Sequence, residues 1–210
     1  MRRILTSLTA FIIVVMASLS GAPEAAAQFR YGPSAGVNFN TLKFKQDLFT
    51  IDSQVGPAAG IVGEMMFPGI GIGIDLGLLY QLRSSKLHMG EREMWASQGY
   101  GKENMDLHMV SIPIHIKLKW HRLGGFEEKL APMVYGGPTF SFMAGHSKID
   151  AMNFSGGDVA LECGIGAEIL ERWQLKAGYS FGMTYLAKAK VLTDFSCRAN
   201  AWTVRLAYYF

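Results

Sequence analysis

The sequence predicts an all-β protein, an eight-stranded antiparallel up-and-down transmembrane β-barrel with both termini on the periplasmic side. Two observations predict it: apolar and polar residues alternate with a period of two through eight segments, and short and long connections alternate between those segments. The final segment is the clearest example. One row of it is apolar and aromatic, and reads Trp202, Val204, Leu206, Tyr208, Phe210. The other row carries Arg205, so we expect it to face a polar interior.

The eight segments cover residues 29–40, 55–67, 70–83, 109–120, 130–144, 158–169, 173–184 and 200–210. In the third segment one row consists of apolar residues from Ile70 to Leu82, while the other row contains Asp75 and Arg83. Such a strand cannot be buried in an apolar core on both faces, because unpaired charges are costly there. It therefore indicates lipid on one side and a polar interior on the other. A soluble lipocalin-like barrel is the rival fold, and it would have the reverse arrangement.

The connections between these segments fall into two classes. Residues 41–53, 84–104, 145–157 and 187–197 form long connections, whereas 68–69 and 171–172 are short and 121–129 is intermediate. Outer-membrane barrels join their strands by short periplasmic turns and longer external loops. The order therefore predicts four external loops and an even number of strands.

The first 27 residues predict a cleaved signal peptide, which leaves 28–210 as the barrel domain. Arg2 and Arg3 precede an apolar stretch from Ile4 to Leu19, and a run of alanines ends at Ala27. Removal of this segment also takes away Glu24, which leaves 18 basic and 16 acidic residues (20 − 2 and 17 − 1). This balance argues neither for nor against a nucleic acid, and we expect none as a partner. No later apolar run is long enough for a spanning helix.

The inward rows carry the charged residues. Because isolated charges in a narrow barrel cost several kcal/mol each, we expect these side chains to pair and fill the lumen. A narrow proton or ion path along them is the alternative. The predicted lumen charge network consists of Arg30, Glu64, Asp75, Arg83, His115, Lys117, Lys119, Glu162, Glu168, Lys176 and Arg205.

Aromatic residues on the outward rows predict a girdle at the membrane surfaces. Its expected members are Tyr80, Trp120, Trp173, Trp202, Tyr208 and Phe210. In the second long connection, Trp95 and Tyr100 stand among charged residues, which suits contact with a partner. Trp95 could instead rest on the membrane surface.

We expect no catalytic residues, no metal and no cofactor. A lipid-modifying enzyme would need a serine, a histidine and a carboxylate together at the lipid-exposed external rim. Ser111, Ser180, His115 and Glu162 all fall on inward rows instead, and the remaining histidines lack metal-ligand spacing. A disulfide between Cys163 and Cys197 is possible but is not implied by their spacing.

Several short motifs resemble the PorT-like outer-membrane β-barrel family of the Bacteroidetes. They are SIPIHIKLK at 111–119, PMVYGGP at 132–138, GIGAEI at 164–169, LKAGYSFGM at 175–183 and VRLAYYF at 204–210. The resemblance covers the whole mature chain and implies an eight-stranded outer-membrane barrel. The founding member is linked to protein secretion across the outer membrane, whereas most relatives are not.

The sequence therefore favours a non-enzymatic protein of the Gram-negative outer membrane, with a side-chain-filled lumen and external loops for structural or interaction roles. Its expected partners are outer-membrane lipid or lipopolysaccharide, an envelope protein, and the outer-membrane assembly machinery through the strand ending at Phe210. The alternatives are an accessory component of a secretion or envelope-assembly machine and a lipid-modifying enzyme.

Overall fold

A computed structural model of the chain describes residues 28–44, 50–67, 71–88, 102–120, 129–146, 152–189 and 196–210. The predicted signal peptide, residues 1–27, lies outside these ranges, as do Trp95 and Tyr100. The expectations for these residues therefore remain predictions.

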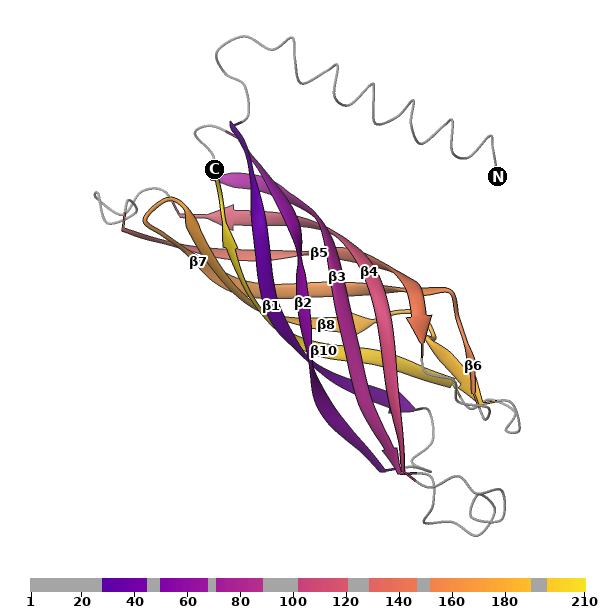
Figure 1. The fold of residues 1–210 in the computed structure, drawn as a ribbon. Coiled ribbons are helices and arrows are strands. Elements are labelled where there is room, and N and C mark those ends of the chain that lie inside the picture. The colour runs from indigo at the N-terminus through magenta and orange to yellow at the C-terminus, as the bar shows by residue number, and fades with distance from the viewer. Residues whose placement is uncertain are drawn as a thin grey trace, which may run out of the picture.

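Eight long antiparallel strands form a closed barrel (Figure 1), which confirms the predicted fold class. Each strand pairs with the next along the chain, and β1 pairs with β10 to close the wall. The strands are β1 (Gln28–Phe44), β2 (Thr50–Met66), β3 (Ile72–His88), β4 (Lys102–Lys119), β5 (Leu130–His146), β7 (Gly157–Ile169), β8 (Trp173–Gly182) and β10 (Ser196–Tyr208). Two short strands, β6 (Met152–Phe154) and β9 (Ala187–Ala189), extend the sheet beside the start of β10.

The strands are staggered around the barrel. Following register partners from Phe29 through every strand leads back to β1 at Phe39, ten residues further along (39 − 29). A stagger of this kind requires the strands to tilt against the barrel axis, and with eight strands the interior is just wide enough for side chains. The start of β1 and the end of β10 lie at the end with the short turns, which faces the periplasm in outer-membrane barrels (Figure 1).

The strands continue further into the long connections than the sequence suggests. β1 runs to Phe44, β3 runs to His88, and β4 begins at Lys102, all within segments that we expected to be loops. The reason is that main-chain hydrogen bonding between neighbours does not need an apolar row once the wall has left the lipid. At the other end β3 begins at Ile72 rather than Ile70. Gly71 precedes the strand at φ 75°, a conformation that glycine adopts without strain.

The side chains obey the predicted alternation. On β4 the Ile116 residue is 65% exposed, whereas the neighbouring Lys117 is fully buried. On β10, Trp202 is 61% exposed and Arg205 only 7%. Exposed apolar residues thus cover the outside of the wall and charged residues line its inside, which is the reverse of a lipocalin-like barrel.

Exposed aromatic residues gather at two levels of the outer wall. The level near the short turns contains the exposed Phe29, Tyr31, Trp120, Trp173 and Phe210. The half-buried Tyr208 lies among them and packs against Trp173 with ring centroids 4.9 Å apart. The other level contains Phe39, Tyr80, Phe142, Phe181 and Trp202. The six expected girdle residues are therefore divided between both levels.

The two cysteines lie on opposite faces of the wall. Cys163 is exposed on the outer side of β7, whereas Cys197 is buried on the inner row of β10. Opposite faces argue against a disulfide between them. Within the described ranges, no helix has the length and apolar character needed to cross a membrane.

Candidate functional site

The lumen holds a chain of seven charged side chains of alternating sign. It runs in the order Lys119, Glu168, Arg30, Glu64, Lys117, Asp75, Lys176. Arg30 Nη2 lies 2.6 Å from both Glu64 Oε1 and Glu168 Oε2. Lys117 Nζ contacts Glu64 and lies 2.8 Å from Asp75 Oδ1. Each member of the chain except the two terminal lysines therefore touches two opposite charges.

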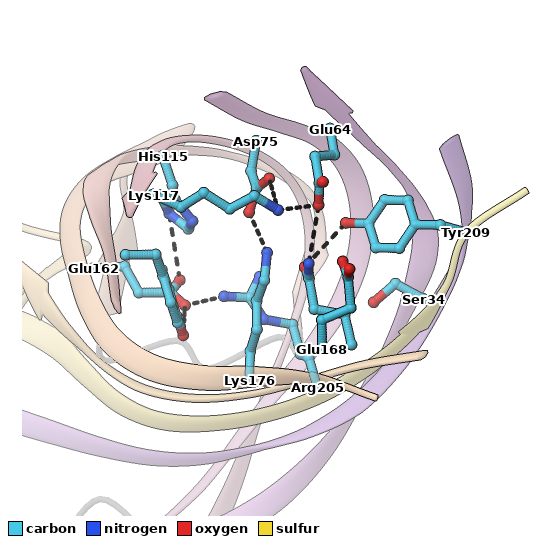
Figure 2. A network of polar contacts seen from close by, with 12 residues as sticks. Ser34, Glu64, Asp75, His115, Lys117, Glu162, Glu168, Lys176, Arg205 and Tyr209 are labelled. Atoms are coloured by element: carbon cyan, nitrogen blue, oxygen red, sulfur yellow. Dashed lines mark hydrogen bonds and ion pairs between the residues drawn. The ribbon is translucent and has the colours of Figure 1, made fainter. Parts of the chain in front are cut away.

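Register explains part of this arrangement. Arg30 on β1 stands directly opposite Glu64 on β2, and opposite charges in that position attract. Glu64 in turn stands opposite Asp75 on β3, a like-charged pair that would be unfavourable alone. Lys117 resolves this repulsion, because its ammonium group is fully buried between the two carboxylates (Figure 2).

A second group surrounds Glu162 on β7. Its Oε1 atom pairs with Arg205 and accepts hydrogen bonds from Tyr135 OH and Thr203 Oγ1, each at 3.2 Å. His115 Nε2 lies 3.9 Å from Glu162 Oε2 and 3.1 Å from Thr139 Oγ1. A buried carboxylate with this many donors is well compensated, which is the condition for keeping a charge in a poorly solvated place.

A third group lies further along the barrel. Arg83 Nη1 is 3.0 Å from Asp158 Oδ2, and its Nη2 donates to Ser141 Oγ at 3.3 Å. We expected Asp158 on an inner row but did not include it among the paired charges. All eleven predicted lumen residues therefore point inward and take part in these three groups, Arg30 and Lys176 being the ones with appreciable exposure.

Gln174 and Tyr209 also belong to the site, although the sequence analysis did not single them out. Gln174 Nε2 donates to Glu64 Oε2 at 2.9 Å, and Tyr209 OH donates to Gln174 Oε1 at 3.2 Å. The Tyr209 ring also faces two cations, with Arg30 Cζ 5.4 Å and Lys117 Nζ 5.8 Å from its centroid. Gln174 and Tyr209 both fall on inward rows of the two-residue alternation, and that position could have identified them as lumen residues.

Little space is left between these side chains. One cavity in the middle of the lumen has a volume of about 20 Å³, enough for one water molecule. Towards the long connections, large apolar side chains are fully buried, and they include Leu79, Met105, Leu107, Met109 and Leu186. In the described part of the chain, the lumen is thus a packed interior of charged residues continued by apolar ones.

The described serines near the external rim form hydrogen bonds other than those of a nucleophile with its base. Ser111 Oγ donates to Ser141 Oγ inside the barrel. On the outer wall, the sequence analysis missed two contacts between β3 and β4: Ser84 Oγ donates to Asp106 Oδ1 at 2.6 Å, and Tyr80 OH hydrogen-bonds with His108 Nδ1. The serine is thus bonded to a carboxylate rather than to an imidazole, which is not the pairing that activates a hydroxyl.

No metal centre is formed among the residues that the structure describes, since no three histidine, cysteine or acidic side chains gather as ligands. The described charges of the lumen are held in pairs and chains of opposite sign. Chemically, such an arrangement of ion pairs can hold the strands in register.

The fold is shared with a solved outer-membrane barrel, OprG. The outer membrane protein OprG from Pseudomonas aeruginosa is similar with a TM-score of 0.53 at 11% identity, covering 87% of this chain and 94% of that one. Neisserial surface protein A has a TM-score of 0.48 at 12% identity, covering 87% and 97%. No curated protein matches the sequence.

The family comparison covers nearly the whole chain. Residues 12–210 match the family described as "Outer membrane protein beta-barrel domain". This match agrees with the closed eight-stranded wall, the apolar exterior and the charged interior described above. The chain therefore belongs to the outer membrane protein beta-barrel domain family and is a protein of the Gram-negative outer membrane.

Proposed function

We propose that this protein is a closed, non-enzymatic barrel whose lumen is a structural plug and whose external part serves structural or interaction roles. The observation that carries the proposal is the alternating chain of seven charges, which fills the described part of the lumen beside a cavity of about 20 Å³. Each buried charge in the chain contacts a neighbour of opposite sign. The chain therefore links the strands from inside the barrel and does not form a binding site for solutes. A barrel of eight strands has little room for both side chains and a solute.

The lipid partner of the proposal is supported by the outer wall. Two arginines stand near its opposite ends, each hydrogen-bonded to a tyrosine: Arg172 to Tyr208 at 3.1 Å and Arg198 to Tyr185 at 3.5 Å. Exposed arginines beside interfacial aromatic residues suit contact with lipid head groups, lipopolysaccharide included in the outer leaflet. The aromatic levels between them suit a bilayer in the same way.

The finer family assignment, PorT-like, is also part of the proposal. Its motifs lie on β4, β5, β7, β8 and β10, so the resemblance follows the strands rather than the external loops. A role in a secretion machine would have to depend on the external segments or on the periplasmic rim.

We expect vesicles that contain the folded wild-type protein to take up a small sugar such as arabinose no faster than empty vesicles. The reason is that the packed lumen leaves no continuous path wide enough for a solute. Light-scattering measurements of vesicle swelling, with a large porin as positive control, check this outcome. Swelling whose rate depends on solute size would contradict the plug.

Glu64→Gln should destabilise the folded barrel by about 3–5 kcal/mol, because it leaves buried cations without their counter-charge. Glu64 is fully buried and contacts Arg30, Lys117 and Gln174. Urea unfolding in lipid vesicles measures the effect. The matched control is Glu171→Gln in an exposed turn, which should change stability by less than about 0.5 kcal/mol. Equal effects of the two substitutions would count against the ion-pair network.

Mild crosslinking in cells should capture the assembly machinery during export, and Phe210→Ala should reduce this capture. Phe210 is 71% exposed at the end of the wall and packs against Tyr208 and Tyr31, with centroids 5.3 Å and 6.0 Å apart. An exposed aromatic residue just after the last strand is accessible for binding by the assembly machinery. Undiminished capture of the variant would refute that role for Phe210, and a stoichiometric secretion protein at steady state would favour the machine instead.

A further inference from the structure

The alternating chain of charges in the lumen is not neutral. It begins with Lys119 and ends with Lys176, so it contains four cations but only three carboxylates. The remaining described ion pairs, Arg205 with Glu162 and Arg83 with Asp158, are matched one to one. Among the described lumen residues, these ion pairs therefore contain one more cation than carboxylates.

The two ends of the chain differ in their surroundings. Lys119 lies at the end of β4, beside the short-turn mouth of the barrel. Lys176 lies inside the barrel and stands directly opposite Arg205 in the register of β8 and β10. Like charges in this position repel each other. At this end of the chain, the excess positive charge therefore lies next to a second cation, where it is costly.

The donors of this pair are not all used. Arg205 contacts Glu162 through Nη2, while its Nε–H is buried and has no hydrogen-bond partner. Lys176 Nζ donates to Asp75 and carries three hydrogens in all. A buried donor without an acceptor costs about 1–3 kcal/mol, so an acceptor beside Arg205 would be favourable.

The small cavity lies at this point. Its lining includes Lys176, Arg205, Ser34, Gln174 and Tyr209, and Asp75 and His115 complete the polar part (Figure 2). Its volume of about 20 Å³ is enough for a water-sized particle. Asp75 is an acidic neighbour, but it is already paired with Lys117 and Lys176.

We propose that this cavity binds one small monovalent anion of the halide class, held between Lys176 and Arg205. The anion supplies the missing negative charge, separates the two cations and accepts the unused Arg205 Nε–H. Chloride, the abundant member of the class, is a single spherical ion somewhat larger than a water molecule. This inference rests on the proposed plug, because the anion would balance the charges of the same lumen.

Two other occupants make different predictions. A water molecule would fill the space without neutralising the lysine. Alternatively, Lys176 could lose its proton, which removes the excess charge without any ligand. In both cases the stability of the barrel would not depend on chloride at constant ionic strength, so the dependence separates the anion from its rivals.

The test is urea unfolding of the full folded barrel while chloride replaces gluconate at constant ionic strength. A ligand that binds only the folded state shifts the midpoint upward with its concentration. We expect the wild-type midpoint to rise with chloride and the Lys176→Met midpoint not to change. Lys119→Met, which removes the cation at the other end of the chain, should keep the rise. A flat wild-type curve, or the same rise in Lys176→Met, overturns the proposal.

A second readout covers the case in which Lys176→Met does not fold. The ³⁵Cl line of a chloride solution should broaden in the presence of the folded wild-type barrel, and bromide should compete with that broadening. Absence of broadening beyond that caused by the urea-unfolded protein overturns the anion site. Vesicle swelling is independent of this result, so a failure of the anion site leaves the closed lumen separately testable.

Discussion

A closed sheet in lipid must satisfy all its main-chain hydrogen bonds within the wall, and this constraint governs the rest of the structure. Once β1 pairs with β10, every residue faces either lipid or lumen, and alternate residues take opposite sides. Apolar residues fill the outer rows. The inner rows then crowd into a cylinder too narrow for bulk water, so the charges there must neutralise one another.

The lumen shows how this neutralisation is reached. Opposite charges face each other across strands in some places, as Arg30 and Glu64 do, but like charges also meet, as Glu64 and Asp75 do. Lysine side chains from further around the wall then insert between them, because a long flexible stem can place an ammonium group where it is needed. Among the described ion pairs, cations exceed carboxylates by one, and we propose an anion where Lys176 stands opposite Arg205.

The rows of the barrel could be predicted from sequence because a period of two assigns each residue to one face. All eleven predicted lumen charges accordingly lie inside. Their partners could not be predicted. Arg30 and Glu168 are 138 residues apart in the chain and meet only because the wall closes. The stagger of ten residues determines which lumen side chains lie next to each other. It depends on the register between strands, which the sequence of a single strand does not specify.

The parts of the strands that extend into the long connections were not predicted, for a different reason. Beyond the apolar outer band, the pattern on β4 reverses: Met105 and Leu107 are buried inside, whereas Asp106 and His108 lie on the outer row. Ser84 and Ser85 on β3 are both buried although they are neighbours, and Ser84 donates a hydrogen bond to Asp106 in a region that the sequence suggested was mostly loop. Main-chain pairing maintains the strands there without the apolar outer row that marks the membrane band.

The most direct test of this account is the introduction of a charge on the outer face at mid-membrane. Ile114 lies on β4 midway between Trp120 and His108, and it is exposed while the adjacent His115 is buried. Ile114→Arg should lower the unfolding free energy in lipid vesicles by about 2–4 kcal/mol, the cost of an arginine facing the bilayer centre, while Ile114→Leu should be nearly neutral. Equal stability of the two variants would show that this face does not meet lipid and would contradict the account.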